Sequence, residues 1–413
     1  MVVFACARCG APLTAPVSRV ALPAHAHQHY GHELLPSLVE PGTYAVEPAH
    51  SGGPWRRWEE FSAEEIEARG VYAPAFSLPC GAPGAIAVAP GDTRGTVVIP
   101  ERCDGYCMGL AGNDGPNLAC AGCGREVGTR IDDCGYWQAV WLVPDAVRPV
   151  GADAPERPVA GWEEWARERA GIPPVDPNGY WDPRWEAAVG AALAHLLVAA
   201  EGRPVAVPDG LLTATFGPAL AALLPKGPPE RKVDLAGPGL TDRAPDIALV
   251  PRHPRTGEPW QPTDSTTAHP AGRTTAQPAH STAARPGRST TAHPAGSTAA
   301  QPAGSTTAQP AHSTAARPVG GAPPESAGGV AVVPLEAGVW AHLAFHQSRP
   351  LPPATGGVPV DVIRDDPLPP HTGGFRVDSH VFQHTLARLP AVREPWLRRI
   401  YDRVREHPYQ PPF

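Results

Sequence analysis

The chain has 413 residues and a net charge of −7, and 55 proline and 43 glycine residues make up about a quarter of it. That share lies just below the level typical of low-complexity sequence, and the Gly-X-Y period of collagen is missing, so a collagen-like protein is excluded. Because 42% of the residues are hydrophobic and 11 are Trp, a packed core is expected, which excludes a fully disordered protein.

The first part of the chain is predicted to be rich in strands. Residues 84–100 contain two short apolar runs joined by a Pro-Gly-Asp turn, and residues 136–143 form a further apolar run, so three strands are expected here. A short helix is predicted within 62–70, because Ser62 and Glu65 match the pattern of a capping box.

Helices dominate the predictions farther along the chain. Asp182-Pro183 is typical of a helix start, and the dense apolar residues that follow predict a buried helix that ends near Gly202. Further helices are predicted at 211–224, 335–347, 379–389 and 395–406, and short strands at 246–250 and 330–333.

An eight-residue repeat interrupts this helical part. Seven units, such as STTAHPAG and STAARPVG, extend from Ser265 to Gly320 and carry four Arg and no acidic residue, so the rest of the chain has a net charge of −11. Alanine and about one proline per unit are too little apolar surface to offset the entropy of ordering. We expect a disordered linker, which is either a tether or a neutral tandem expansion in a surface loop.

These elements predict an α+β protein with four segments. Residues 1–150 are expected to form a β-rich, cysteine-bearing, zinc-binding domain, and 155–262 the first part of a mainly helical α/β domain. The octapeptide-repeat linker covers 263–320, and the second part of the helical domain covers 321–413.

Two segments share one cysteine pattern, which is an apolar residue, then Cys-x-x-Cys-Gly, then a second apolar residue. The cysteines are Cys6 and Cys9 in the first segment and Cys120 and Cys123 in the second. Two thiolates at this spacing bind one ion only on a tight turn, and a glycine after the second cysteine permits the positive φ that such a turn needs. Four thiolates in a tetrahedral arrangement suit Zn²⁺, which is the expected cofactor.

The two segments resemble the knuckles of zinc-ribbon proteins, and this resemblance implies that the four cysteines are the zinc ligands. The 110 residues between the knuckles exceed the usual spacing in ribbons. The sequence around GPNLACAGCG and DDCGYWQAVWL also resembles an uncharacterised actinobacterial protein family with such a knuckle pair, and no function follows from this likeness.

A compact set that joins the second knuckle to Cys103 and Cys107 competes with the distant pairing. Closing the longer loop costs only about 2 kcal/mol more, whereas a structural zinc contributes about 10–16 kcal/mol, so the symmetry of the knuckles favours the distant pair. Cys103, Cys107 and Cys134 then form an alternative second metal site, completed by Cys80 or a histidine, or they are small buried hydrophobic residues.

Histidines are the remaining candidate ligands. The run AHAHQHYGH, from Ala24 to His32, is interpreted as an exposed loop, although metal binding is an alternative. His342 and His346 lie four residues apart on a predicted helix, but no Glu follows the first, so the metalloprotease motif is absent. With Asp365-Asp366, these two histidines are the basis for an enzyme as the alternative function.

The leading prediction is a zinc-binding structural or protein-interaction protein with a protein partner and without catalysis. Nucleic-acid binding is disfavoured by the negative charge. The longest apolar run, from Ala187 to Ala200, is too short to cross a bilayer, and the first residues do not resemble a signal peptide. We therefore expect a cytoplasmic protein that does not enter the membrane.

Overall fold

The structure is a computed structural model that describes most of the chain outside the repeat. Described are residues 1–26, 34–103, 105, 107, 109–151, 161–168, 171–175, 179–241, 245–261, 329–346 and 375–407. The described residues all belong to one compact unit. The predicted repeat linker lies outside the described residues, so its disorder stays a prediction, as does the boundary near residue 150.

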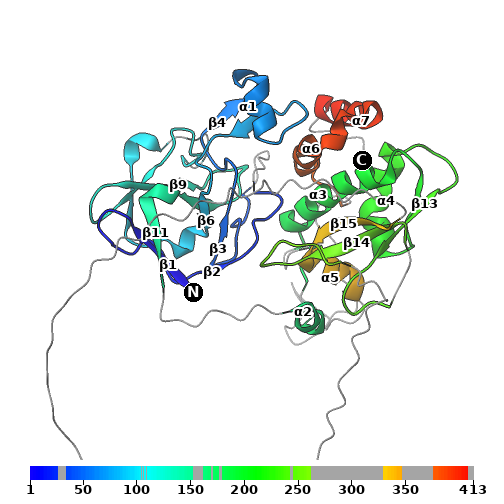
Figure 1. Ribbon diagram of the computed structural model, residues 1–413, viewed down its shortest axis with the longest axis horizontal. Coiled ribbons are helices and arrows are strands. Elements are labelled where there is room, and N and C mark those ends of the chain that lie inside the picture. Colours follow the sequence, from blue (N-terminus) through cyan, green and yellow to red (C-terminus); the bar gives the residue numbers. More distant parts are fainter. Residues whose placement is uncertain are drawn as a thin grey trace, which may run out of the picture. The chain divides into compact units, whose positions relative to one another are not determined.

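A seven-stranded sheet contains most strands of the first 150 residues (Figure 1). Its order is β2 (Ser18–Arg19), β3 (Thr43–Val46), β6 (Ile86–Val88), β10 (Ala139–Leu142), β9 (Glu126–Ile131), β8 (Leu118–Cys120) and β7 (Thr96–Val98). Only the pair β2–β3 is parallel. The three strands predicted at 84–100 and 136–143 are confirmed as β6, β7 and β10, although β6 and β7 lie far apart in the sheet.

Two short ribbons accompany this sheet. Their strands are β1 (Val2–Cys6) with β11 (Val147–Gly151), and β4 (Trp55–Arg57) with β5 (Ser77–Pro79). The helix α1 (Ala63–Ala68) lies between β4 and β5 in the sequence and begins at Ser62, whose hydroxyl accepts a hydrogen bond from the Glu65 N–H at 3.2 Å. The Glu65 carboxylate accepts the Ser62 N–H in return, so the predicted capping box is confirmed.

A four-stranded parallel sheet occupies the later part of the first unit. Its strands, in order, are β12 (Val205–Ala206), β13 (Arg231–Leu235), β14 (Ile247–Arg252) and β15 (Ala331–Glu336). The helices are α2 (Trp162–Glu168), α3 (Pro183–Ala200), α4 (Leu211–Leu223), α5 (Ala337–Phe345), α6 (Ser379–Ala387) and α7 (Pro395–Glu406). Figure 1 shows α3 and α5 on opposite faces of β14 and β15. Both helices and sheets are thus present, as the α+β prediction required.

The helices largely match their predictions. Asp182 caps α3 by accepting the Arg184 N–H at 2.8 Å, as its position before proline predicted. The helix predicted at 335–347 begins two residues later, because Leu335 and Glu336 complete β15, and the Glu336 carboxylate then caps α5. Strands β12 and β13 were not predicted.

Helix α3 contributes to two hydrophobic clusters. Ala187 and Ala191 pack in one cluster with Trp141 of the seven-stranded sheet. Trp185 and Leu193 belong to a second cluster, which includes residues of the parallel sheet and α5. Burial on both sides explains the dense apolar sequence of this helix.

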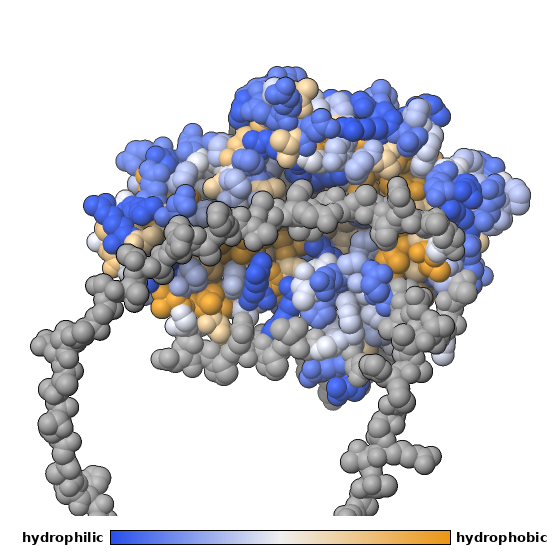
Figure 2. Space-filling view, in the orientation of Figure 1, coloured by the Kyte–Doolittle hydropathy of each residue, from blue (hydrophilic) through white to orange (hydrophobic). Residues whose placement is uncertain are grey.

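The outer surface near α1 is predominantly hydrophilic in the view of Figure 2. Among the described residues, no helix combines the length and the apolar character that crossing a bilayer requires.

Candidate metal centre

The first knuckle is a tight turn at the end of β1. Cys6 is the last residue of this strand; its N–H donates to the Ala11 carbonyl at 2.8 Å, and its carbonyl accepts the Gly10 N–H at 2.9 Å. Gly10 has a φ of 77°, which lies in the left-handed region that favours glycine. The chain therefore reverses between the two cysteines of this segment.

The second knuckle repeats this geometry at the end of β8. The Cys120 N–H donates to the Arg125 carbonyl at 2.8 Å, and the Cys120 carbonyl accepts the Gly124 N–H at 2.8 Å. Gly124 has a φ of 71°. The expectation of a glycine with positive φ after each second cysteine is confirmed at both knuckles.

The segment before β7 connects the two knuckles. Leu13, just after the first knuckle, accepts the Arg94 N–H at 2.8 Å, and the Gly95 carbonyl accepts the Ala121 N–H of the second knuckle at 2.9 Å. These backbone hydrogen bonds place the turn after β1 beside the turn after β8, although the knuckles are distant in sequence.

The four thiols of the knuckles lie together. The Sγ atoms of Cys6 and Cys123 are 3.7 Å apart, those of Cys9 and Cys120 are 3.6 Å apart, and all four lie within 4.8 Å of one another. A disulfide has an S–S distance of about 2.05 Å, so these are free thiols at metal-binding distances. Cys6 and Cys120 are buried, whereas Cys9 is exposed.

The two thiols of the first knuckle differ in pKa because their surroundings differ. Burial alone would raise the pKa of the Cys6 thiol, but the backbone N–H groups of Cys9 and Arg8 donate to its sulfur and lower the pKa to about 7. At Cys9, the Ala11 N–H lowers the pKa, but the neighbouring thiols, Cys120 first, raise it to about 11. Four adjacent thiolates are therefore stable only when a cation balances their charge.

The predicted second site is brought together only in part. Cys107 and Cys134 lie within 4.8 Å of each other and of Asp133. The sequence marks the pair Asp132-Asp133 only as a candidate for acid–base chemistry, so Asp133 was not predicted as a ligand. The exposed Cys103 is not part of this group and instead donates its S–H to the Ile99 carbonyl at 3.4 Å. The Cys80 thiol donates to the Leu78 carbonyl at 3.7 Å. The compact set that would join the second knuckle to Cys103 and Cys107 does not form among the described residues.

The described histidines among the candidates differ in burial, since His342 is half-buried and His346 is exposed. The interpretation of the run from Ala24 to His32 as an exposed loop is wrong at His25. His25 is buried, and its ring centroid lies 4.1 Å from that of Trp137; burial lowers its pKa to about 3. The remaining histidines of that run lie outside the described residues. The His342 ring meets Trp185 edge to face at 5.2 Å and stacks on His346 at 6.4 Å.

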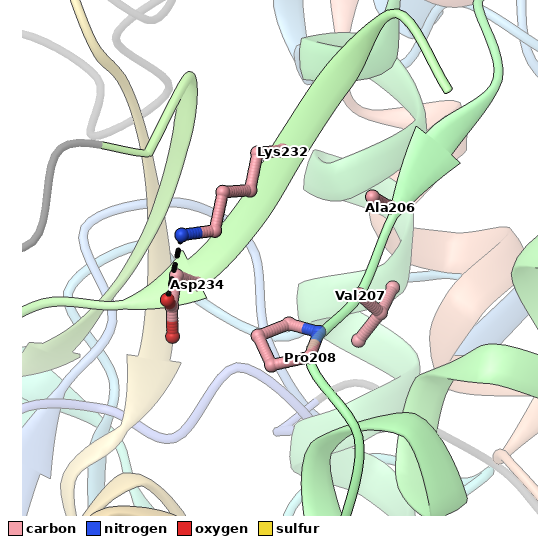
Figure 3. A pocket seen from close by; sticks show the side chains of 5 residues that line it. All are labelled: Ala206, Val207, Pro208, Lys232 and Asp234. Carbon is pink, nitrogen blue, oxygen red and sulfur yellow. Dashed lines mark ion pairs between the residues drawn. The ribbon is translucent and has the colours of Figure 1, made fainter. Parts of the chain in front are cut away.

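A pocket of about 440 Å³ lies at the carboxyl ends of β12 and β13 (Figure 3). It is lined by Ala206, Val207, Pro208, Lys232 and Asp234. Figure 3 shows the Lys232 ammonium pointing toward the Asp234 carboxylate, at a distance of 3.5 Å. The two histidines proposed for an enzyme do not line this pocket, and Asp365-Asp366 lie outside the described residues, so the alternative of an enzyme stays a prediction.

Comparison with protein-family models, with curated proteins and with solved structures finds no match for this chain. The resemblances to zinc ribbons and to an actinobacterial family therefore stay predictions, and the arguments about function rest on the geometry of the sites.

Proposed function

We propose that the four knuckle thiols bind one Zn²⁺ in a structural, zinc-ribbon-like site. The two sulfur pairs at 3.6 and 3.7 Å carry this proposal. With Zn–S bonds of about 2.3 Å, the edge of a tetrahedron of sulfur atoms is about 3.8 Å long. The separations therefore suit a tetrahedral zinc ion and exceed a disulfide bond by far.

The zinc ion stabilises the fold and takes no part in catalysis. Four thiolates fill the tetrahedral shell, so no position remains for water or a substrate. The ion cross-links the turn after β1 to the turn after β8 and thereby fastens the β1–β11 ribbon to the seven-stranded sheet.

The stabilised sheet serves as a docking surface for a protein partner. Strand β7 is at the edge of the sheet, and Val97 and Val98 on this strand are 50% and 42% exposed. Thr96 of β7 pairs with Cys120, so the edge lies next to the zinc site. An exposed apolar edge can accept an extended segment of another protein as an added strand. The net charge of −7 disfavours nucleic acid as the partner.

Zinc stoichiometry tests the metal part of this proposal. Mass spectrometry of the purified protein measures zinc per chain, and we expect Cys6→Ser and Cys120→Ser each to lose one zinc ion. Cys80→Ser is the matched control, because this thiol lies outside the knuckle cluster and donates to the Leu78 carbonyl. Unchanged zinc in Cys6→Ser would overturn the knuckle pairing.

Site-specific photo-crosslinking in cells tests the partner part. We expect a crosslinker at Val97 to capture one protein, and the capture to disappear in the Cys120→Ser background. A crosslinker at Arg57, an exposed residue of β4, is the control and should capture no such protein. Equal capture at both positions, or capture of nucleic acid alone, would contradict a protein-binding edge at β7.

A further inference from the structure

A second metal-ligand cluster lies at the end of β9, away from the knuckle thiols. It combines Cys107 with Asp133 and Cys134, and one ligand atom from each lies within 4.8 Å of the others. The two contributing segments are joined by the backbone, because the Asp132 N–H donates to the Leu110 carbonyl at 2.8 Å. A backbone hydrogen bond just beyond β9 therefore holds the two segments side by side.

The carboxylate of this cluster is held in place inside the protein. Asp133 is only 4% exposed, and its Oδ1 accepts the Cys134 N–H at 2.7 Å. The backbone at Gly105 lies directly over the other oxygen, since a Cβ at this glycine would come within 2.1 Å of Asp133 Oδ2. Gly105 also has a φ of 143°, so both the close approach and the backbone conformation require glycine.

The charges of the cluster suit a cation. The hydrogen bond with Cys107, burial and the Asp133 carboxylate together raise the pKa of the Cys134 thiol to about 11. Without a cation, the buried carboxylate therefore disfavours deprotonation of the two neighbouring thiols. A divalent cation makes the deprotonated thiols favourable, because it attracts the carboxylate and both thiolates.

We propose that Cys107, Asp133 and Cys134 bind a second Zn²⁺ whose fourth position is open to water or a small anion. Two thiolates and one carboxylate are ligands that zinc accepts, and three protein ligands plus one exchangeable ligand are typical of open zinc sites. Cys107 is exposed, so a small molecule reaches the metal from solvent. A metal held in this way is a Lewis acid, in contrast to the closed site at the knuckles.

Zinc content tests the existence of this site independently of the knuckle site. We expect two zinc ions per chain in the unchanged protein and one in Cys107→Ser and Cys134→Ser, with far-UV circular dichroism unchanged. Cys103→Ser, which removes a nearby exposed thiol outside the cluster, should keep two. A single zinc in the unchanged protein that persists in Cys107→Ser and disappears in Cys6→Ser would overturn this proposal and leave the structural site intact.

Cobalt substitution tests the open position. Visible absorption of the Co²⁺-loaded protein should shift when cyanide is added, whereas Co²⁺-loaded Cys107→Ser, which retains only the knuckle site, should show no shift. Asp133→Asn should weaken Co²⁺ binding at the second site at least tenfold without changing the knuckle spectrum. A spectrum insensitive to cyanide would overturn the open position.

Discussion

The seven-stranded sheet and the four-stranded parallel sheet differ in what holds their strands in place. The strands of the first sheet are short and separated by long loops, and the turn after β1 meets the sheet at a cluster of four thiols. In the second sheet, β14 is almost entirely buried and lies between α3 and α5. The central strands of both sheets are buried, so a metal bound by the four thiols would add a cross-link to the first sheet. Among the described residues, no such cluster lies in the second sheet, where helices cover both faces of β14.

Removal of the metal ligands is expected to have the largest effect on the difference between the two sheets. Cys6→Ser should destabilise the seven-stranded sheet by more than about 5 kcal/mol, because structural zinc contributes about 10–16 kcal/mol and a whole domain has a net stability of only about 5–15 kcal/mol. Hydrogen exchange should show loss of protection in β8 and β9 and retained protection in β14 and β15. Simultaneous loss in both sheets would mean that they unfold as one unit.

A change in the apolar core should destabilise the parallel sheet and leave the zinc site intact. Trp340 is fully buried on α5, and its indole N–H donates to the Leu249 carbonyl at 3.0 Å. Trp340→Ala should cost about 3–5 kcal/mol, since it leaves a large cavity and removes the hydrogen bond from the indole to the Leu249 carbonyl. Urea unfolding measures this cost, and zinc content should stay unchanged. Loss of zinc in this variant would contradict separate stabilisation of the two sheets.

The buried histidine His25, which packs on Trp137 beside the seven-stranded sheet, should make the free energy of unfolding depend on pH. Burial, with a smaller effect of Arg184, lowers the pKa of His25 from 6.5 to about 3, so the folded protein holds this ring neutral. Because the unfolded chain protonates this ring below pH 6.5 and the folded protein does not, the free energy of unfolding falls there by about 1.4 kcal/mol per pH unit, until about pH 3. Above pH 6.5 the histidine causes no loss of stability. Between pH 7 and pH 5 the loss amounts to about 2 kcal/mol.

The variant His25→Phe keeps an aromatic ring against Trp137 and cannot be protonated. Urea unfolding at both pH values should show a smaller loss of stability than in the unchanged protein. If the two proteins lose stability equally, the ring of His25 is not the group that responds to acid.

The smallest expected effect concerns the backbone of the second knuckle. A Cβ at Gly124 meets no atom within 4 Å, so Gly124→Ala tests only the positive φ, which should cost about 1–2 kcal/mol and weaken zinc binding. Gly91→Ala is the matched control, because this glycine is equally unobstructed and its φ lies outside the left-handed region. Equal stability of the two variants, measured in urea, would show that the turn tolerates a side chain.

Elements with a strong local pattern were predictable. Helix α7 has the bounds 395–406 that were predicted, because its apolar residues follow the helical period on one face. Helix α3 was recognised from its cap and its apolar density. Strands β12 and β13 were missed, since two to five residues next to prolines have no periodicity that distinguishes a strand from a loop.

The two metal-ligand clusters also differ in how far the sequence predicts them. The sequence alone determined the knuckles, because the cysteine spacing and the following glycine dictate the turn within five residues. Only the tertiary structure decided that Asp133 joins Cys107 and Cys134 while Cys103 faces its own backbone. Which side chains meet there depends on how the ends of β9 and the segment before β8 are placed by strand pairing, a long-range property that residue spacing does not contain.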